Sequence, residues 1–196
     1  MRVLVIGSGG REHALCWKLS GSLIVNELYC APGNGGTSLT ATNVGISAND
    51  IDRLLQFALE NEIDLTVVGP EEPLVLGLTD AFEEAGLNIF GPNAFSAQLE
   101  GSKDYAKKFM IKHGVPTARY RTYTELPDAL EGIKEFTYPL VVKADGLCLG
   151  KGVTICENKD MAVKALEESL KDKVFGKEGD KVVVEEFLKG TEASLL

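Results

Sequence analysis

The sequence predicts an α/β protein in which a doubly wound parallel sheet is followed by a smaller α+β domain. Short apolar runs alternate with helical stretches through residue 92, as in a parallel sheet covered by helices on both faces. From Arg119 onward the strands are shorter and the helices amphipathic, and two of these strands flank a glycine-rich loop. The expected divisions are a first domain at 1–92, a helical linker segment at 93–118 and a second domain at 119–196.

Composition and charge exclude several classes of protein. The 196 residues carry a formal net charge of -9, which argues against nucleic acid and anionic membranes as partners because both select basic surfaces. The four cysteines form neither a CxxC pair nor a His–Cys cluster, which favours reduced thiols over disulfides or zinc. The chain has neither a signal-peptide pattern nor a membrane-spanning apolar stretch. We therefore expect a cytoplasmic protein. The sequence does not indicate how many copies of the chain associate.

The first strand and helix enclose a candidate anion site. Arg2 to Ile6 is an apolar strand that runs into Gly7-Ser8-Gly9-Gly10, and a helical pattern follows from Arg11 to Leu19. Free N–H groups and the helix dipole converge at such a turn. A dinucleotide fingerprint would need glycine where Glu12 stands, so a monophosphate on a small metabolite fits better, beside the alternative of a tight turn without a ligand.

Two further strand ends carry candidate ligand-binding residues. The strand Glu27 to Cys30 leads into a loop with Gly33, Asn34 and Gly35, and the strand Leu65 to Val68 is followed by Glu71. Open α/β sheets bind ligands at the carboxyl ends of their strands, so these residues are expected beside Gly9 and Gly10. Ordinary turn chemistry and a carboxylate paired with a helix dipole are the alternatives.

The remaining elements are expected to pack around the two sheets. Ser47 with Asp50 resembles a capping box, ahead of an apolar stripe that begins at Ile51. A single helix is expected from Ala94 to His113, and its Lys103 either reaches a phosphate or lies on a solvated face. The other expected helices are 51–59, 74–85, 127–136 and 159–173, and the other expected strands are 87–90 and 119–123.

The segment KADGLCLGKGV, from Lys143 to Val153, is the most informative loop. It lies between the apolar runs 139–142 and 153–156, which we expect to be the two strands of a hairpin. Its glycines and lysines suit phosphate oxygens, although a strand follows where a Walker A motif would need a helix. A hairpin flap over a nucleotide is the favoured interpretation and a flexible exposed hairpin the alternative. The candidate residues are Lys143, Gly146, Gly150, Lys151 and Gly152.

The last strand, Val182 to Leu188, is a candidate adenine site. The backbone at Glu185 and Glu186 would form hydrogen bonds with adenine, and Phe187 or Leu188 would pack against its ring. Glu192 would accept hydrogen bonds from ribose hydroxyls. The alternative is a strand that runs out into solvent.

Six segments together resemble the ATP-grasp ligases and, among them, the glycinamide ribonucleotide synthetase (phosphoribosylamine–glycine ligase) family. The segments are GSGGREHAL at 7–15, APGNGG at 31–36, VVGPEEPL at 67–74, GSKDYAKKFM at 101–110, VVKADGLCLGKGV at 141–153 and VVVEEFLKGTEASLL at 182–196. The resemblance covers the N-terminal part of the family pattern. It implies a pre-ATP-grasp domain followed by the first subdomain of the ATP-grasp fold, with the second half of that fold missing.

The resemblance also implies residue roles. Phosphoribosylamine would bind at Gly9, Gly10, Gly33, Asn34, Gly35 and Glu71. Lys103 and Lys143 would contact ATP phosphates under the loop Gly146 to Gly152, with adenine at Glu185 to Leu188 and ribose at Glu192. Cys148-Leu149 replaces the two alanines that are common in the family, so larger side chains must pack in this flap. The tip, Leu147 to Lys151, is expected to be poorly ordered without nucleotide.

The implied reaction joins glycine to phosphoribosylamine in de novo purine biosynthesis, with ATP converted to ADP and phosphate through a glycyl phosphate. Positioning and charge stabilisation would drive this carbon–nitrogen ligation, and no catalytic side chain is assigned. The ligands of Mg²⁺ are expected in the missing half, so this chain by itself is expected to be inactive. The alternatives are another ATP-grasp carboxylate–amine ligase, a noncatalytic nucleotide-binding module and an NAD oxidoreductase.

Overall fold

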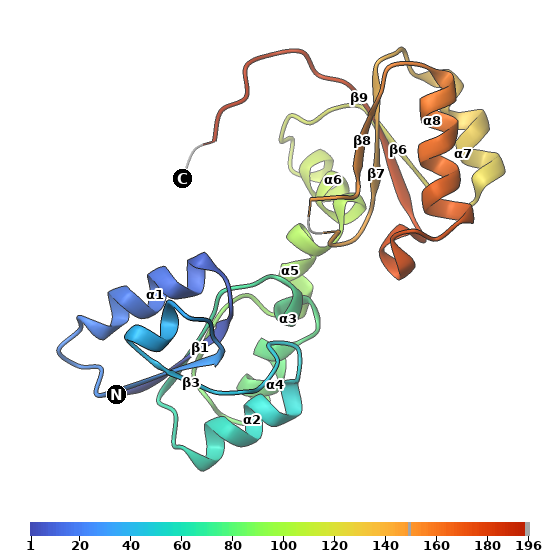
Figure 1. Ribbon diagram of the computed structural model, residues 1–196. Coiled ribbons are helices and arrows are strands. Elements are labelled where there is room, and N and C mark those ends of the chain that lie inside the picture. The colour runs from blue at the N-terminus through green and yellow to red at the C-terminus, as the bar shows by residue number, and fades with distance from the viewer. Residues whose placement is uncertain (149, 195–196) are drawn as a thin grey trace. The chain divides into compact units, whose positions relative to one another are not determined.

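The computed structural model describes residues 1–148 and 150–194 (Figure 1). The chain forms two compact units, Met1–Gln98 and Leu99–Leu196, and each is described by itself. Within the described residues no helix is long and apolar enough to span a membrane.

The first unit is a five-stranded parallel sheet with strand order β3-β2-β1-β4-β5. Its elements are β1 (Arg2–Gly7), α1 (Gly10–Ser20), β2 (Glu27–Pro32), η1 (Thr37–Leu39), β3 (Thr42–Asn43), α2 (Ile51–Glu60), β4 (Leu65–Val68), α3 (Glu72–Val75), α4 (Leu78–Glu84) and β5 (Ile89–Phe90). The helix α5 (Ala94–Gly101) includes the boundary between the units at Gln98 and Leu99. The expected doubly wound sheet is therefore confirmed.

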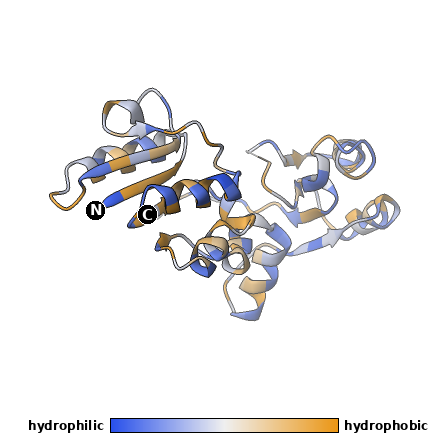
Figure 2. Ribbon diagram, turned by 90° about the horizontal axis from the view of Figure 1, so that it is seen from below, coloured by the Kyte–Doolittle hydropathy of each residue, from blue (hydrophilic) through white to orange (hydrophobic). Residues whose placement is uncertain are grey.

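Each face of this sheet has its own apolar core. Leu4 and Ile6 of β1 pack with Leu54 and Phe82 on the side of α2 and α4. Val5 and its neighbours on the opposite face pack against α1. Because successive strand residues point to opposite faces, a strand covered on both sides is apolar on both, as β1 is from Val3 to Ile6. Figure 2 colours the chain by hydropathy.

The expected single helix over 74–85 is wrong. Two helices, α3 and α4, meet at Gly77, whose φ of 94° lies in the left-handed region that interrupts an α-helix. The cap of α2 is Asp50, which accepts a hydrogen bond from the Arg53 N–H, so Ser47 does not begin the helix.

The second unit is a four-stranded antiparallel sheet with strand order β6-β9-β7-β8. Its elements are α6 (Lys103–Lys112), β6 (Tyr120–Tyr123), α7 (Leu126–Gly132), η2 (Ile133–Glu135), β7 (Leu140–Ala144), β8 (Val153–Cys156), α8 (Lys159–Leu166), a π-helical turn η3 (Glu167–Lys171), η4 (Gly176–Gly179) and β9 (Val182–Glu186). Strands β7 and β8 are antiparallel neighbours, which confirms the hairpin around the glycine loop.

The two faces of this sheet differ in chemistry. Leu140, Val142 and Val184 face the apolar core beneath α7 and α8. The next residue along each strand, Lys143 after Val142 and Glu185 after Val184, therefore lies on the opposite face, on the side of α6. This second face carries the polar groups of the unit.

Three expected elements of this region have different boundaries. The helix expected from Ala94 to His113 is two helices, because Ser102 is extended (φ −138°, ψ 118°) and its Oγ accepts a hydrogen bond from the Tyr105 N–H as a new N-cap. The α-helix expected to reach residue 173 ends at Leu166, and the last strand ends at Glu186.

Candidate functional site

The structure brings the three expected loops of the first unit to one edge of the sheet. Gly7 at the end of β1 is in register with Pro32 at the end of β2, and Ile6 is in register with Val68 of β4. After β1 the chain first builds β2 and β3 on one side and then crosses to β4 on the other. The loops after β1, β2 and β4 therefore surround a topological switch point, where open α/β sheets bind ligands.

Asn34 ties two of these loops together. Its side-chain amide donates to the carbonyl oxygens of Ser8, at 2.8 Å, and Gly9, at 3.0 Å, while its Oδ1 accepts from the N–H groups of Gly36 and Thr37. Two donors and two acceptor positions are thus engaged within the protein. The Asn34 side chain therefore fixes the conformation of the two loops at this edge of the sheet. Its amide group forms these hydrogen bonds within the protein and does not face a ligand with unpaired donors.

Glu12 is a buried carboxylate that sequence reasoning treated only as the residue that spoils a dinucleotide fingerprint. It is 2% exposed, and its Oε2 accepts a hydrogen bond from the Gly9 N–H. A Cβ atom at Gly7 would lie 2.5 Å from the Glu12 side chain, and one at Gly69 would lie 2.0 Å from its Oε1. The glycines at the ends of β1 and β4 are therefore required by the volume of this one side chain.

Arg11 and Glu71 form a bidentate ion pair across the same edge. The guanidinium nitrogens lie 2.8 and 3.2 Å from the two carboxylate oxygens. Hydrogen bonding from Arg11 holds the pKa of the Glu71 carboxyl below its ordinary value, although burial opposes this shift. Glu71 is therefore an ionised group at the expected site.

His13 also belongs to this edge, although the sequence shows it only as an isolated histidine. Its ring packs so closely on the second loop that a Cβ at Gly36 would lie 2.5 Å from Nδ1. His13 is three residues after Gly10, so the two lie on the same face of α1. This spacing is the sequence signal that could have placed His13 near the ligand-binding edge.

In the second unit Asp145 joins the glycine loop to the N-terminus of α6. Its Oδ1 accepts from the Asp104 N–H at 2.7 Å, and its Oδ2 accepts from the Ser102 hydroxyl at 2.9 Å. Lys103 donates through Nζ to the carbonyl oxygens of Asp145, at 3.3 Å, and Gly146, at 2.9 Å. Lys103 thus lies at the base of the loop, as a phosphate ligand would require, and Asp145 holds it there.

The glycine positions of the loop have separate physical reasons. A Cβ at Gly146 would lie 1.7 Å from Oε2 of Glu178, and one at Gly152 would lie 2.7 Å from Cβ of Cys148. Gly150 has a φ of 78°, which favours glycine. Lys151 is exposed, and its N–H donates to the Cys148 carbonyl in a tight turn. Leu149, within the expected flap tip, lies outside the described residues.

Glu185 lies at the centre of a buried charge cluster on the second face of the sheet. Its Oε2 is 3.0 Å from Nζ of Lys143 and 3.1 Å from Nζ of Lys107. Its Oε1 is shielded from solvent and lacks a hydrogen-bond partner among the described residues. The structure thus pairs two of the expected nucleotide residues and adds Lys107, which sequence reasoning missed because the pairing joins positions far apart in the chain.

The end of β9 presents the other expected adenine residues. Glu186 pairs with Arg119 of the neighbouring chain segment, donating its N–H to the Arg119 carbonyl at 3.0 Å and accepting the Arg119 N–H on its Oε1 at 2.8 Å. Phe187 and Leu188 are 36% and 65% exposed, so both apolar side chains are open to a ligand. Glu192 is exposed beyond them.

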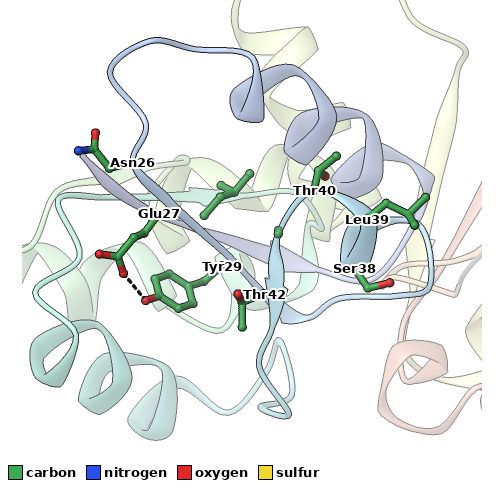
Figure 3. A pocket seen from close by; sticks show the side chains of 9 residues that line it. Asn26, Glu27, Tyr29, Ser38, Leu39, Thr40 and Thr42 are labelled. Carbon is green, nitrogen blue, oxygen red and sulfur yellow. Dashed lines mark hydrogen bonds between the residues drawn. The ribbon is translucent and has the colours of Figure 1, made fainter.

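Of the hollows in the described part of the chain, one lies away from these groups and another borders Asp104 and Arg119. One of about 460 Å³ in the first unit is lined by residues 26–29 and 38–42, and its Tyr29 hydroxyl is already bonded to Glu27 (Figure 3). Another of about 670 Å³ borders α6 and β6 in the second unit, and its Lys108 and Lys181 both pair with Asp104.

The described residues contain no group of three or more His, Cys, Asp or Glu side chains placed to hold a metal ion. The charged groups at the candidate sites are instead Glu71 in the first unit and, in the second unit, the lysines beside the glycine loop with Glu185. Such a set suits phosphate oxygens and hydroxyl or amino groups.

Comparisons with known proteins cover the whole chain. The family model described as "Phosphoribosylglycinamide synthetase, N domain" matches residues 1–100, and "Phosphoribosylglycinamide synthetase, ATP-grasp (A) domain" matches residues 101–196. A phosphoribosylamine–glycine ligase of Pasteurella multocida (strain Pm70) is 51% identical over 198 residues, which cover 100% of this chain and 46% of the relative.

Solved structures show the same likeness. The phosphoribosylamine–glycine ligase of Thermotoga maritima matches with a TM-score of 0.79 and 34% identity, over 97% of this chain and 45% of that one. The biotin carboxylase domain of Hydrogenobacter thermophilus 2-oxoglutarate carboxylase, crystallised with MgADP, ADP and bicarbonate, matches with a TM-score of 0.75 and 20% identity, over 96% of this chain and 44% of that one, which shows a shared fold. The chain spans about half the length of the curated relatives it matches.

Proposed function

Because the chain belongs to the phosphoribosylglycinamide synthetase family, whose two domain models together match residues 1–196, we propose that it carries the phosphoribosylamine site and one wall of the ATP site of a phosphoribosylamine–glycine ligase. The whole reaction joins the carboxyl group of glycine to the amine of phosphoribosylamine. ATP is consumed, and the products are glycinamide ribonucleotide, ADP and phosphate. Such an enzyme belongs to de novo purine biosynthesis in the cytoplasm.

The observation that supports the nucleotide site most strongly is the buried Glu185 carboxylate. Its Oε1 lacks a hydrogen-bond donor among the described residues, and a buried acceptor without a donor costs free energy. The exocyclic amino group of adenine would supply that donor. In this proposal Lys143 leaves Glu185 for the phosphates when ATP binds, and Phe187 and Leu188 cover the ring.

The phosphates would lie where the glycine loop meets α6. Lys103 already lies at the base of the loop, held through the carbonyls of Asp145 and Gly146. Backbone N–H groups of Gly150 and Gly152 can approach oxygen atoms closely, and Lys151 adds an exposed charge. We propose that Mg²⁺ accompanies ATP, where it would be held by phosphate oxygens together with one or two carboxylates and would neutralise charge on the phosphates.

The phosphoribosylamine site would use the sheet edge of the first unit. The N-terminus of α1 at Gly9 and Gly10 suits the 5-phosphate, because the helix dipole and first-turn N–H groups favour an anion. The loop at Gly33 and Gly35 lies beside it, and the ionised Glu71 suits hydroxyl or amino groups.

The chemistry then needs two bond exchanges. A glycine carboxylate oxygen attacks the γ-phosphorus of ATP and ADP leaves, which gives glycyl phosphate. The amine of phosphoribosylamine attacks its carbonyl carbon, the carbon–oxygen bond to phosphate breaks, and the amine loses a proton. The residues of this chain contribute orientation and positive charge to the first exchange.

Binding of ribose 5-phosphate, a stable stand-in for phosphoribosylamine, tests the first site. A Cβ at Gly10 would meet no atom within 4 Å, so Gly10→Ala and Gly10→Asp should both fold. We expect the aspartate to abolish binding by repulsion, while alanine reduces it only a few-fold. Calorimetry with ribose as the control ligand measures this. Equal binding of ribose and ribose 5-phosphate, or an unaffected Gly10→Asp variant, contradicts the phosphate site.

A further inference from the structure

We propose that Lys107 is a positioning residue that holds Glu185 for adenine and thereby sets the preference of the site for a 6-amino over a 6-oxo purine. The inference rests on the nucleotide site proposed above and assigns a role to a residue of α6 that touches neither phosphate nor base. It starts from the contacts of three side chains, Lys107, Lys143 and Glu185.

Both lysines bind the same oxygen of Glu185. Their Nζ atoms lie 3.1 and 3.0 Å from Oε2, so Oε1 is left without a partner among the described residues. A carboxylate held through one oxygen keeps its other oxygen in a fixed direction, free for one further donor.

The two lysines are not equivalent. Lys107 also donates to Oγ1 of Thr117 at 2.8 Å and to the Ala118 carbonyl at 3.4 Å, so its three ammonium protons have three acceptors. Its ammonium lies 5.6 Å from the centre of the Tyr120 ring, which adds a cation–π contact. The Lys107 ammonium group is therefore held by its hydrogen bonds, its ion pair and the aromatic ring together.

Lys143 is held more loosely. Its side chain is 27% exposed, against 9% for Lys107. Glu185 is its partner within the described residues, and no further acceptor holds its ammonium in the way that Thr117 and Ala118 hold that of Lys107. Lys143 is thus the lysine that can exchange between Glu185 and a phosphate, and Lys107 is the one that stays.

This asymmetry matters once Lys143 moves to the phosphates. Glu185 then has Lys107 as its remaining counter-charge, and in a chain without Lys107 the buried carboxylate would have no cation to hold it in place. Its Oε1 would no longer be directed at the 6-amino group of adenine. The preference for adenine over hypoxanthine, which has an oxygen at position 6, would then be lost.

The test compares dissociation constants for ATP and inosine triphosphate, measured by NMR titration of the 196-residue chain. We expect the unaltered chain to bind ATP at least about tenfold more tightly, the equivalent of about 1.4 kcal/mol. Lys107→Met should bring the ratio close to one, mainly by weakening ATP. Lys107→Arg should keep most of the preference, because it keeps the positive charge beside Glu185. The matched control is Lys164→Met, a lysine of α8 with a 77% exposed side chain, which should leave both constants unchanged.

A purely structural role for Lys107 predicts a different result. Lys107→Met would then weaken both nucleotides by the same factor, and an unchanged ratio overturns the proposal. An unaltered chain that binds both nucleotides equally overturns it as well. If the unaltered chain binds neither, the nucleotide site itself fails, which is distinct from an unchanged ratio in a chain that binds ATP.

A second variant covers the case in which Lys107→Met does not fold. Lys107→Met combined with Glu185→Gln removes both buried charges, and replacing a buried ion pair as a whole costs little compared with removing one partner. An amide at position 185 can both donate and accept, so we expect this chain to fold and to bind the two nucleotides within about threefold of each other. Retention of the full ATP preference in this double variant overturns the proposal.

Discussion

Glu12 shows how one side chain determines the residue types around it. Its carboxylate lies against Gly7, Gly9 and Gly69, at the ends of two neighbouring strands, and a Cβ at any of the three would come within 2.9 Å of it. The sequence showed the glycines and suggested an anion site. It could not show that the buried carboxylate of Glu12, which is distant in sequence from Gly69, is part of the reason for their size.

A double-mutant cycle tests this reason. Gly69→Ala should destabilise the chain by about 1–3 kcal/mol, the usual cost of overpacking a filled site. In a Glu12→Ala background the same change should cost less, because the atoms that it meets are gone. Urea unfolding of the four chains measures the coupling. Additive effects of the two substitutions would show that Glu12 is not the cause.

Cys148 provides a chemical probe of the glycine loop. It is partly exposed, whereas Cys16, Cys30 and Cys156 are buried. Burial raises the pKa of the Cys148 thiol, so we expect slow alkylation at pH 7 that speeds up as the pH passes above the ordinary thiol range.

ATP should slow this alkylation further, because the loop would then cover the phosphates. Mass spectrometry of iodoacetamide-treated protein measures the rate at Cys148, with adenosine as the control ligand. Alkylation that is equally fast with and without saturating ATP would contradict the assignment of this loop to the nucleotide.

At the scale of elements, Asp145 connects the β7–β8 hairpin to α6. Its two oxygens accept from the Asp104 N–H and the Ser102 hydroxyl, so one side chain fixes the first turn of the helix that carries Lys103. We expect Asp145→Ala to cost about 1–3 kcal/mol, because a buried N–H loses its acceptor. Hydrogen exchange at the Asp104 amide should then accelerate in step with the loss of stability. An unchanged exchange rate would contradict this connection.

The same helix should respond to acid through Asp104. Burial opposes ionisation of Asp104, but hydrogen bonds from Lys108, Lys181 and Thr122 outweigh it and hold its pKa below the ordinary value. A lowered pKa in the folded state stabilises the fold above the unfolded-state value of about 3.9, and this stabilisation is lost as pH falls through the lowered value.

Acid titration followed by circular dichroism measures the effect. The unaltered chain should lose stability as the pH falls below about 4, and Asp104→Asn should be less stable at pH 7 but show a shallower loss over that acid range. A parallel slope for both chains would show that Asp104 does not contribute to the acid response.

Element types were predictable from the sequence where local patterns decide them. Short apolar runs and the turn residues that bound them gave the parallel sheet and the β7–β8 hairpin, both of which the structure confirms. The helix breaks at Gly77 and Ser102 had local signals, a glycine and a capping serine, that the apolar periodicity masked. The pairing of Lys107 with Glu185 had no such signal, because the two positions meet only through packing of α6 on the sheet.

At the scale of the whole chain, the two units present different binding chemistries. The unit Met1–Gln98 offers a helix N-terminus and an ionised carboxylate at a switch point, which suits a sugar phosphate. The unit Leu99–Leu196 offers lysines, a glycine loop and a buried carboxylate, which suits a nucleotide. The two units are separated by their internal contacts, and the ligand proposed for each unit rests on the side chains of that unit alone.

The most direct test of this account maps both ligands on the 196-residue chain by amide NMR. ATP is expected to shift the amide signals of Gly146, Gly150, Gly152 and the segment 185–188. Ribose 5-phosphate is expected to shift those of Gly9, Gly10 and Gly35. Each ligand should leave the other set unchanged. Shifts by ATP at the Gly9–Gly10 turn with none in the β7–β8 loop would contradict the central claim that this loop and Glu185 form the nucleotide site.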